Sequence, residues 1–178
     1  MTEVEQIAAL LRERNAVDAE MAAIIRRPMT AGHLGEWVAA RVFGIELETS
    51  AVTAAFDGRF TSGPLRGRTV NVKWYLKREG LLDLTERAEL DHYLVLAGPA
   101  SPAASSRGGT RPWCIESVHV FDARQVVAEL RARGVRVGTA SSVRAAQWAA
   151  AEIYPRASNP VLPVRPEQAE LLRLFAPR

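Results

Sequence analysis

The sequence predicts an α/β protein in which helices flank a central mixed β-sheet. Helix-like segments with capping residues alternate along the chain with short segments in which apolar residues recur at every second position. A length of 178 residues suits one domain with a sizeable core, and 48% hydrophobic with 24% charged residues is ordinary globular composition. These observations exclude disordered and fibrous classes for the chain as a whole.

Residues 1–30 predict a helical appendage outside the core. Thr2 with Glu5 three positions later is typical of a capping box, which opens a first helix. Asn15 with Asp18 predicts the cap of a second helix that ends before Pro28. We therefore expect two N-terminal helices.

Residues 31–98 predict the core, because here the periodicity changes from helical to strand-like. Thr30 can cap a helix that runs through Phe43 and stops at Gly44. Short strand-like runs follow in IELE, AVTAAFDGRF and RTVNVKWY, with a turn before the third. LLDLTERAELDH favours a helix and HYLVLAG a buried strand. The expected order is helix, strand, strand, strand, helix, strand.

Beyond the core, residues 99–112 are so rich in Pro, Gly, Ser and Ala that we expect a flexible loop. Residues 113–178 predict a C-terminal α/β extension that packs on the same domain. In it WCIESVHVF favours a strand, Asp122 caps a helix, Ser141 or Ser142 caps another, and PEQAELLRLF forms a short amphipathic helix.

Charge and cysteine content give the expected surroundings of the protein. A net charge of +3 slightly favours the binding of polyanions. A single cysteine and the absence of a basic leader or a long apolar run predict a cytoplasmic protein that does not enter a membrane. Basic residues concentrate between Asp57 and Arg78, where the chain places Arg59, Arg66, Arg68, Lys73, Lys77 and Arg78. This run predicts a surface for nucleic acid, although a merely solvated basic surface is the alternative.

The strand VNVKW carries the chemistry, since side chains alternate across a sheet. Asn71 and Lys73 share one face and the valines the other. In the preceding strand the same alternation predicts Phe56, Gly58 and Phe60 on the apolar side and Ala55, Asp57 and Arg59 opposite. If the two strands pair, Asp57 comes beside Asn71 and Lys73. A carboxylate and an amide oxygen suit Mg²⁺ or Mn²⁺, and a nearby ammonium can orient water or stabilise an anionic transition state. Hydrolysis of phosphodiester bonds uses all of these groups.

Asp57 followed by Asn71-Val72-Lys73, after the helix GHLGEWVAARVFG, resembles the PD-(D/E)xK superfamily of restriction-endonuclease-like nucleases. The resemblance covers about residues 31–98. It implies a restriction-endonuclease-like core with four residues at the active site: Glu36 as the helix acid, Asp57 as the central metal ligand, the Val72 carbonyl as a further ligand, and Lys73 as the catalytic lysine.

Asn71 departs from the family pattern, in which an acid is usual. An amide oxygen can coordinate a cation but brings no negative charge, so metal affinity should fall. Of 23 basic residues only Lys73 and Lys77 are lysines. An ammonium thus stands at the motif position in a chain that otherwise uses arginine, which cannot release a proton near neutral pH.

Each site residue also has a structural alternative. Glu36 can pair with an arginine such as Arg41, Asp57 can be a turn residue before Gly58, and Lys73 can be a surface strand lysine. We expect a Mg²⁺- or Mn²⁺-dependent endonuclease that acts on DNA. Because each chain has one site, cutting both strands of a duplex would make a homodimer natural. The alternative is a non-catalytic nucleic-acid-binding or scaffold protein with a degenerate PD-(D/E)xK fold.

Overall fold

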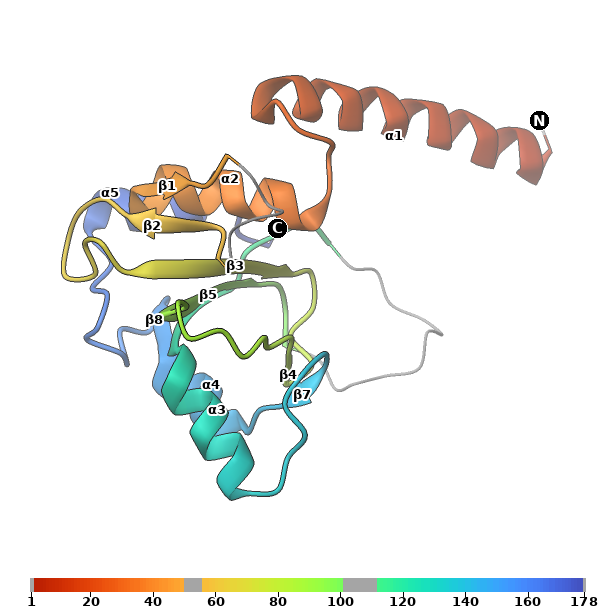
Figure 1. Ribbon diagram of the computed structural model, residues 1–178. Coiled ribbons are helices and arrows are strands. Elements are labelled where there is room, and N and C mark those ends of the chain that lie inside the picture. Colours follow the sequence, from red (N-terminus) through yellow and green to blue (C-terminus); the bar gives the residue numbers. More distant parts are fainter. Residues whose placement is uncertain (1, 50–55, 101–111, 178) are drawn as a thin grey trace.

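The computed structural model describes residues 2–49, 56–100 and 112–177 (Figure 1). In these residues the chain forms a mixed six-stranded central sheet and five helices. The helices are α1 (Glu3–Ile25), α2 (Ala31–Phe43), α3 (Ala123–Ala132), α4 (Ala145–Ala151) and α5 (Pro166–Arg173). The strands are β1 (Ile45–Leu47), β2 (Gly58–Phe60), β3 (Thr69–Tyr75), β4 (Leu81–Leu82), β5 (His92–Ala97), β6 (Ser117–Asp122), β7 (Ser141–Ser142) and β8 (Glu152–Tyr154). The predicted α/β class with a mixed sheet is confirmed.

The central sheet has the strand order β1-β2-β3-β5-β6-β8. Neighbouring strands are antiparallel except β3 and β5, which run parallel with Val72 opposite Leu94. β4 and β7 pair separately as a small two-stranded sheet. β6 and β8 belong to the same sheet as β1–β3, so the chain after residue 112 extends the sheet of the preceding segment.

Helices cover both faces of the sheet because both faces of the central strands are apolar. One core cluster joins α2 and α5 to the face that carries Val70, Val72 and Trp74. The other joins α3 and α4 to the opposite face, through residues such as Tyr93 and Trp148. β5 is buried along its whole length, as its apolar sequence predicts. α1 lies outside these layers, above α2 (Figure 1).

The predicted limits of α2 are confirmed by its caps. The Thr30 side chain accepts a hydrogen bond from the His33 N–H at 3.1 Å, and Gly44 closes the helix with φ +67°. A left-handed residue at this point favours glycine, which pays no Cβ penalty there. Asp122 likewise caps α3, accepting from the Gln125 N–H at 2.8 Å.

The prediction of two N-terminal helices is wrong. The capping box of Thr2 and Glu5 is present, but α1 continues without a break to Ile25. Asp18 is not a cap. It pairs with Arg14 one turn earlier at 3.7 Å, an i,i+4 pair that supports a continuous helix.

The helix predicted for LLDLTERAELDH is also wrong, since only the short strand β4 forms there and the chain is irregular from Asp83 to Asp91. Tertiary hydrogen bonds hold this segment extended: the Tyr75 hydroxyl accepts from the Asp83 N–H, and the Tyr93 hydroxyl accepts from the Thr85 N–H, both at 2.8 Å. These contacts outweigh a helix propensity of a few tenths of a kcal/mol per residue.

Neither Ser141 nor Ser142 caps a helix, contrary to the prediction. Both lie in β7, and the Ser141 hydroxyl bonds to Gly138 instead. α4 begins at Ala145 and is shorter than predicted, because the chain before Pro155 returns to the sheet as β8. The short helix predicted near the C-terminus is confirmed as α5.

Two of the predicted segments lie partly outside the residues that the structure describes. Most of the loop predicted over residues 99–112, like the start of the strand predicted from Ala51, lies outside the described residues. Within the described ranges, no helix combines the length and the apolar character needed to cross a membrane.

Candidate active site

A glycine on α2 sets how closely this helix approaches the sheet. A Cβ built on Gly35 would come within 3.0 Å of the Trp74 Cβ on β3, which is tighter than ordinary side-chain contacts. Glycine at this position lets the helix backbone lie against β3. The next residue, Glu36, is held near the edge of β3 as a result, with its side chain 15% exposed.

Asp57 lies directly before β2, at the point where the pairing of β2 with β3 ends. Its backbone N–H donates to the Val70 carbonyl at 2.9 Å. Its side chain turns towards β3, where Oδ2 accepts from the Val72 N–H at 2.7 Å. The carboxylate therefore takes the place that a longer β2 would occupy. In a strand the N–H and C=O of one residue point to the same side, so the Val72 carbonyl faces this position too.

The alternation predicted for β3 is observed. Val70, Val72 and Trp74 are buried against α2, whereas Asn71 and Lys73 are half-buried on the opposite face. Glu36 and the pair Asn71 and Lys73 thus belong to opposite sides of the sheet. The Asp57 carboxylate lies beside the β3 backbone, between the two sides, where the charges of both Glu36 and Lys73 act on it.

The predicted alternation of the preceding strand does not hold. Phe60 belongs to the core under α2, but Phe56 packs on the other core cluster, with the Arg59 guanidinium 4.7 Å from its ring centre. The regular strand begins only at Gly58, and a bend at residues 56 and 57 breaks the period of two. Ala55, predicted to share the face of Asp57, lies outside the described residues.

The electrostatics of Asp57 show which charges surround it. Burial raises the pKa of Asp57 above its usual range, and the hydrogen bond from Val72 opposes this shift. The Glu36 carboxylate raises the pKa further, while the Lys73 ammonium and the Arg27 guanidinium lower it. Glu36, Lys73 and Arg27 therefore lie near enough to Asp57 for their charges to act on its carboxylate.

Arg27 is a member of this group that the sequence analysis missed. It follows α1, in the segment that leads to α2, and its Nη1 donates to Glu36 Oε2. The partner proposed as an alternative for Glu36, Arg41, instead stacks over the Trp37 ring at 5.0 Å. Nothing in the motif indicates Arg27, because it lies nine residues before Glu36 and belongs to a different element.

Asn71 carries an unsatisfied oxygen. Its Oδ1 is buried and has no hydrogen-bond partner among the described residues. A buried acceptor left unpaired costs free energy of about 1–3 kcal/mol, so such an atom calls for a ligand, an ion or a water. The ammonium of Lys73, on the same face, forms no ion pair with any described residue within 4.0 Å.

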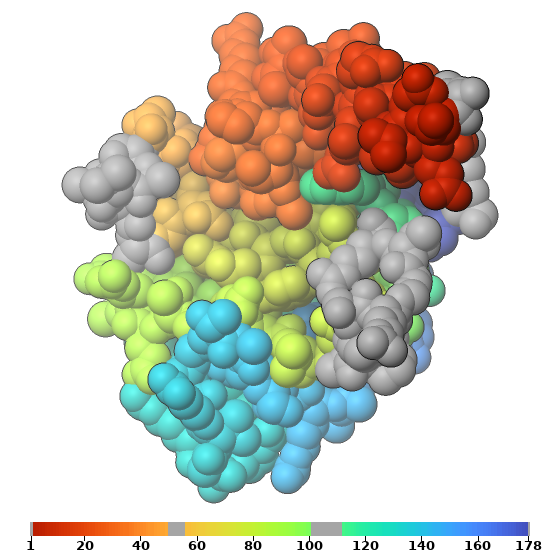
Figure 2. Space-filling model, turned by 90° about the vertical axis from the view of Figure 1, so that its right-hand side faces the viewer, coloured from red at the N-terminus to blue at the C-terminus, as the bar shows by residue number. Residues whose placement is uncertain are grey.

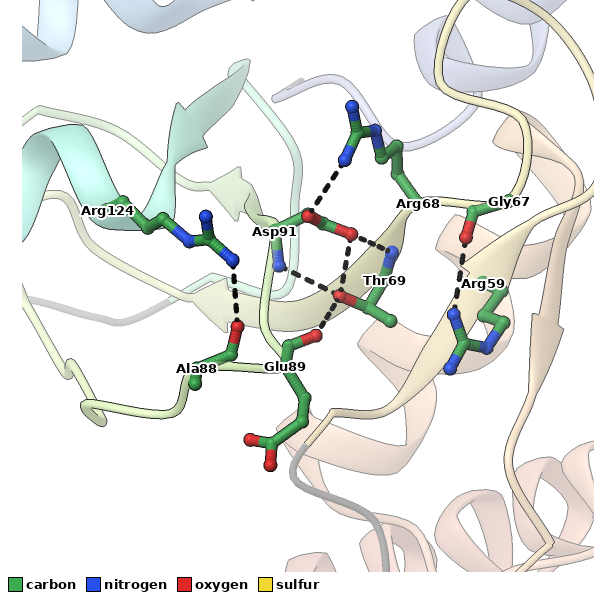
Figure 3. A network of polar contacts seen from close by, with 8 residues as sticks. All are labelled: Arg59, Gly67, Arg68, Thr69, Ala88, Glu89, Asp91 and Arg124. Atoms are coloured by element: carbon green, nitrogen blue, oxygen red, sulfur yellow. Dashed lines mark hydrogen bonds and ion pairs between the residues drawn. The ribbon is translucent and has the colours of Figure 1, made fainter.

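The basic residues fall into two groups at opposite ends of β3. Arg59, Arg66 and Arg68 are exposed at the β2–β3 hairpin. Figure 3 shows that Arg59 donates to the Gly67 carbonyl and Arg68 to Asp91. Lys77 and Arg78 follow the other end of the strand and are half-buried: Lys77 pairs with Glu79 at 3.8 Å, and Arg78 lies over the Trp148 ring.

Asp91 ties the starts of β3 and β5 together (Figure 3). Its Oδ2 accepts from the Thr69 N–H at 2.9 Å, and its own N–H donates to the Thr69 hydroxyl at 2.8 Å. Burial opposes ionisation, but these hydrogen bonds and Arg68 hold the pKa of Asp91 below its usual range. Asp91 is a loop residue with a structural role. It does not belong with Asp57, Glu36 and Lys73.

Fold and site together define an α/β protein in which two carboxylates, Glu36 and Asp57, lie near two cations, Arg27 and Lys73, beside β3 of the mixed sheet. No protein-family model matches the sequence, and a comparison with characterised protein sequences finds no significant match.

Proposed function

We propose that the protein is a metal-dependent nuclease of the PD-(D/E)xK type that hydrolyses phosphodiester bonds in DNA. The observation that carries this proposal is the position of Asp57 against the β3 backbone, with Glu36 and Lys73 close enough to shift its pKa. A carboxylate held where two strands part, beside a lysine on the next strand, is the arrangement expected of this class of nuclease.

The donor set fits a hard cation such as Mg²⁺ or Mn²⁺. Glu36 and Asp57 supply carboxylate oxygens, the Val72 carbonyl faces the same position, and Asn71 Oδ1 is a buried oxygen without a partner in the described chain. Mg²⁺ usually takes one or two carboxylates and completes its shell with water and substrate phosphate. When bound, the ion would lower the pKa of a coordinated water and neutralise charge on the phosphate.

Lys73 is the residue that we assign to the attacking water. Its ammonium lies on the Asn71 face, and lysine can both orient a water molecule and accept or return a proton, which arginine cannot. Arg59, Arg66 and Arg68 on one side, with Lys77 and Arg78 on the other, would bind the phosphates that flank the scissile bond. Arg68 and Lys77 are nine residues apart along the chain, a span of roughly 30 Å if fully extended.

The fold supports a restriction-endonuclease-like core in its first elements. α2 is followed by the antiparallel strands β1, β2 and β3, and β5 then runs parallel to β3. The connection from β3 to β5 contains β4 and irregular chain where a helix is expected.

Incubation of the protein with double-stranded and single-stranded DNA, and with RNA, tests the function directly. With millimolar Mn²⁺ or Mg²⁺ we expect DNA fragments on gels, and none when a chelator is present. Binding of DNA without cleavage of any substrate under either ion would contradict the enzyme and favour the alternative of a non-catalytic nucleic-acid-binding protein.

Replacing Arg27 with alanine is expected to strengthen Mn²⁺ binding by on the order of tenfold. The guanidinium neutralises Glu36 and also acts on Asp57, so it competes with a divalent ion for the same carboxylates. Calorimetric titration with Mn²⁺ measures the change. The control is Arg41→Ala, which removes an arginine that stacks on Trp37 and should leave the affinity unchanged. Weaker Mn²⁺ binding in Arg27→Ala would show that the ion does not use these carboxylates.

A further inference from the structure

α1 stands apart from the rest of the molecule and exposes apolar side chains. At 1.5 Å per residue, its 23 residues span about 35 Å. Ile25 is its buried residue, whereas Ile7, Leu10, Val17 and Ile24 are 52–66% exposed. In Figure 1 the N-terminal part of α1 extends past the sheet, and Figure 2 shows its red atoms at the upper surface. Contiguous exposed apolar surface of this kind marks an interaction site.

The exposed residues follow the spacing of a coiled coil. Positions separated alternately by three and four residues form one seam along the helix, which we call the α1 stripe: Ile7, Leu10, Arg14, Val17, Met21 and Ile24. A repeat of 3.5 residues keeps such a seam facing a partner helix. Ile25 and the half-buried Ala22 and Asp18 lie on the neighbouring side, which faces the body. Met21 is half-buried beside them, and the other members of the α1 stripe are exposed.

We propose that the α1 stripe binds the α1 stripe of a second copy of this chain in an antiparallel coiled coil. The proposal is independent of the nuclease reaction. Antiparallel pairing about a two-fold axis between Asn15 and Ala16 sets Ile7 opposite Ile24 of the second copy and Leu10 opposite its Met21. Every layer then pairs two apolar side chains except the two central ones, in each of which Arg14 of one copy meets Val17 of the other.

Arg14 selects this orientation. In a parallel pair each position meets its own copy, so two Arg14 guanidinium groups would face each other in the seam. In the antiparallel pair the Arg14 stem lies along Val17 while its charged end reaches water and the acidic Glu20 of the second copy. Arg14 is 65% exposed in the single chain, where its contact with Asp18 is long at 3.7 Å, so it is available for this role. A single polar residue in a seam commonly fixes orientation.

Light scattering coupled to size-exclusion chromatography tests the dimer with the full chain. The wild type is expected at twice the chain mass of 19.5 kDa. Leu10→Glu/Ile24→Glu should halve the measured mass, because it places acids opposite the apolar Met21 and Ile7 of the second copy. Ala16→Glu/Ala23→Glu adds the same charges on the exposed opposite side of α1 and should remain dimeric. A monomeric wild type, or a dimeric Leu10→Glu/Ile24→Glu protein, would overturn the proposal. Unchanged circular dichroism and melting of the sheet domain show that each variant is folded.

Crosslinking tests the orientation. A mixture of Leu10→Cys and Met21→Cys proteins should be joined by a short bismaleimide, whereas Leu10→Cys alone should not, since its two copies would lie about 16 Å apart along the seam. The native Cys114 is buried, and the unsubstituted protein serves as the control for it. Crosslinking of Leu10→Cys with itself would indicate a parallel pair and contradict the antiparallel arrangement.

Discussion

Asp57→Asn protein is expected to lose Mn²⁺ binding and, with it, detectable cleavage of DNA. The substitution removes the charge of the central ligand while an amide oxygen can still accept the Val72 N–H, so the edge of β3 should keep its shape. Thermal denaturation provides the measurement. Millimolar Mn²⁺ should raise the melting temperature of the wild type, because the ion binds the native state, and should leave that of the variant unchanged.

The same variant has a predictable stability without metal. Burial raises the pKa of Asp57, so the ionised carboxylate is less favourable in the folded than in the unfolded protein at neutral pH. Asp57→Asn should therefore melt at the same or a higher temperature, and the gain should vanish as the pH falls below the unfolded pKa. Asp18→Asn on α1 is the matched control and should keep the Mn²⁺ response. An Mn²⁺ response that persists in Asp57→Asn would remove Asp57 from the site.

Lys73→Arg is expected to lower the rate of Mn²⁺-dependent cleavage by on the order of 10², the scale that a positioned acid or base contributes. Positive charge is kept, so DNA binding should stay nearly the same, but a guanidinium cannot exchange a proton at neutral pH. Single-turnover cleavage with enzyme in excess separates the chemical step from binding.

The sequence offers one control of the same chemistry, because Lys77 is the other lysine of the chain. Lys77→Arg should cleave at the wild-type rate, since its ammonium lies beside Glu79 beyond the end of β3. Equal loss of activity in both variants would point to general phosphate binding. Full activity in Lys73→Arg would exclude a role for Lys73 in proton transfer.

Features that depend on local sequence were predictable. The cap residue and the terminal glycine of α2 stand directly at the two ends of the helix, so the sequence alone gives its limits. The alternation of β3 follows directly from VNVKW. The irregular chain from Asp83 to Asp91 was not predictable in this way, because distant tyrosine hydroxyls hold it. The continuity of α1 past Asn15 shows that one polar residue with cap preference is a weak sign of a helix end.

The candidate site shows the same division. Asn71 and Lys73 share one face of β3 because side chains alternate along a strand. The pairing of β2 with β3 then places Asp57 next to β3. The sequence did not indicate that Asp57 would lie in the plane of the sheet, between Glu36 on one side and Lys73 on the other. Phe56 was misplaced because a bend, which one sequence does not reveal, precedes β2. Arg27 reaches Glu36 only through the tertiary fold.

The two outer strands of the sheet bear on how the protein behaves at high concentration. In the described part of the chain β1 and β8 each have three residues, and Pro155, which lacks an N–H, directly follows β8. Long, flat edge strands offer unpaired backbone groups to other chains and promote aggregation, whereas short edges and proline prevent it. Strand addition between molecules is therefore disfavoured at both edges. We expect the folded protein not to form amyloid-like assemblies even at high concentration.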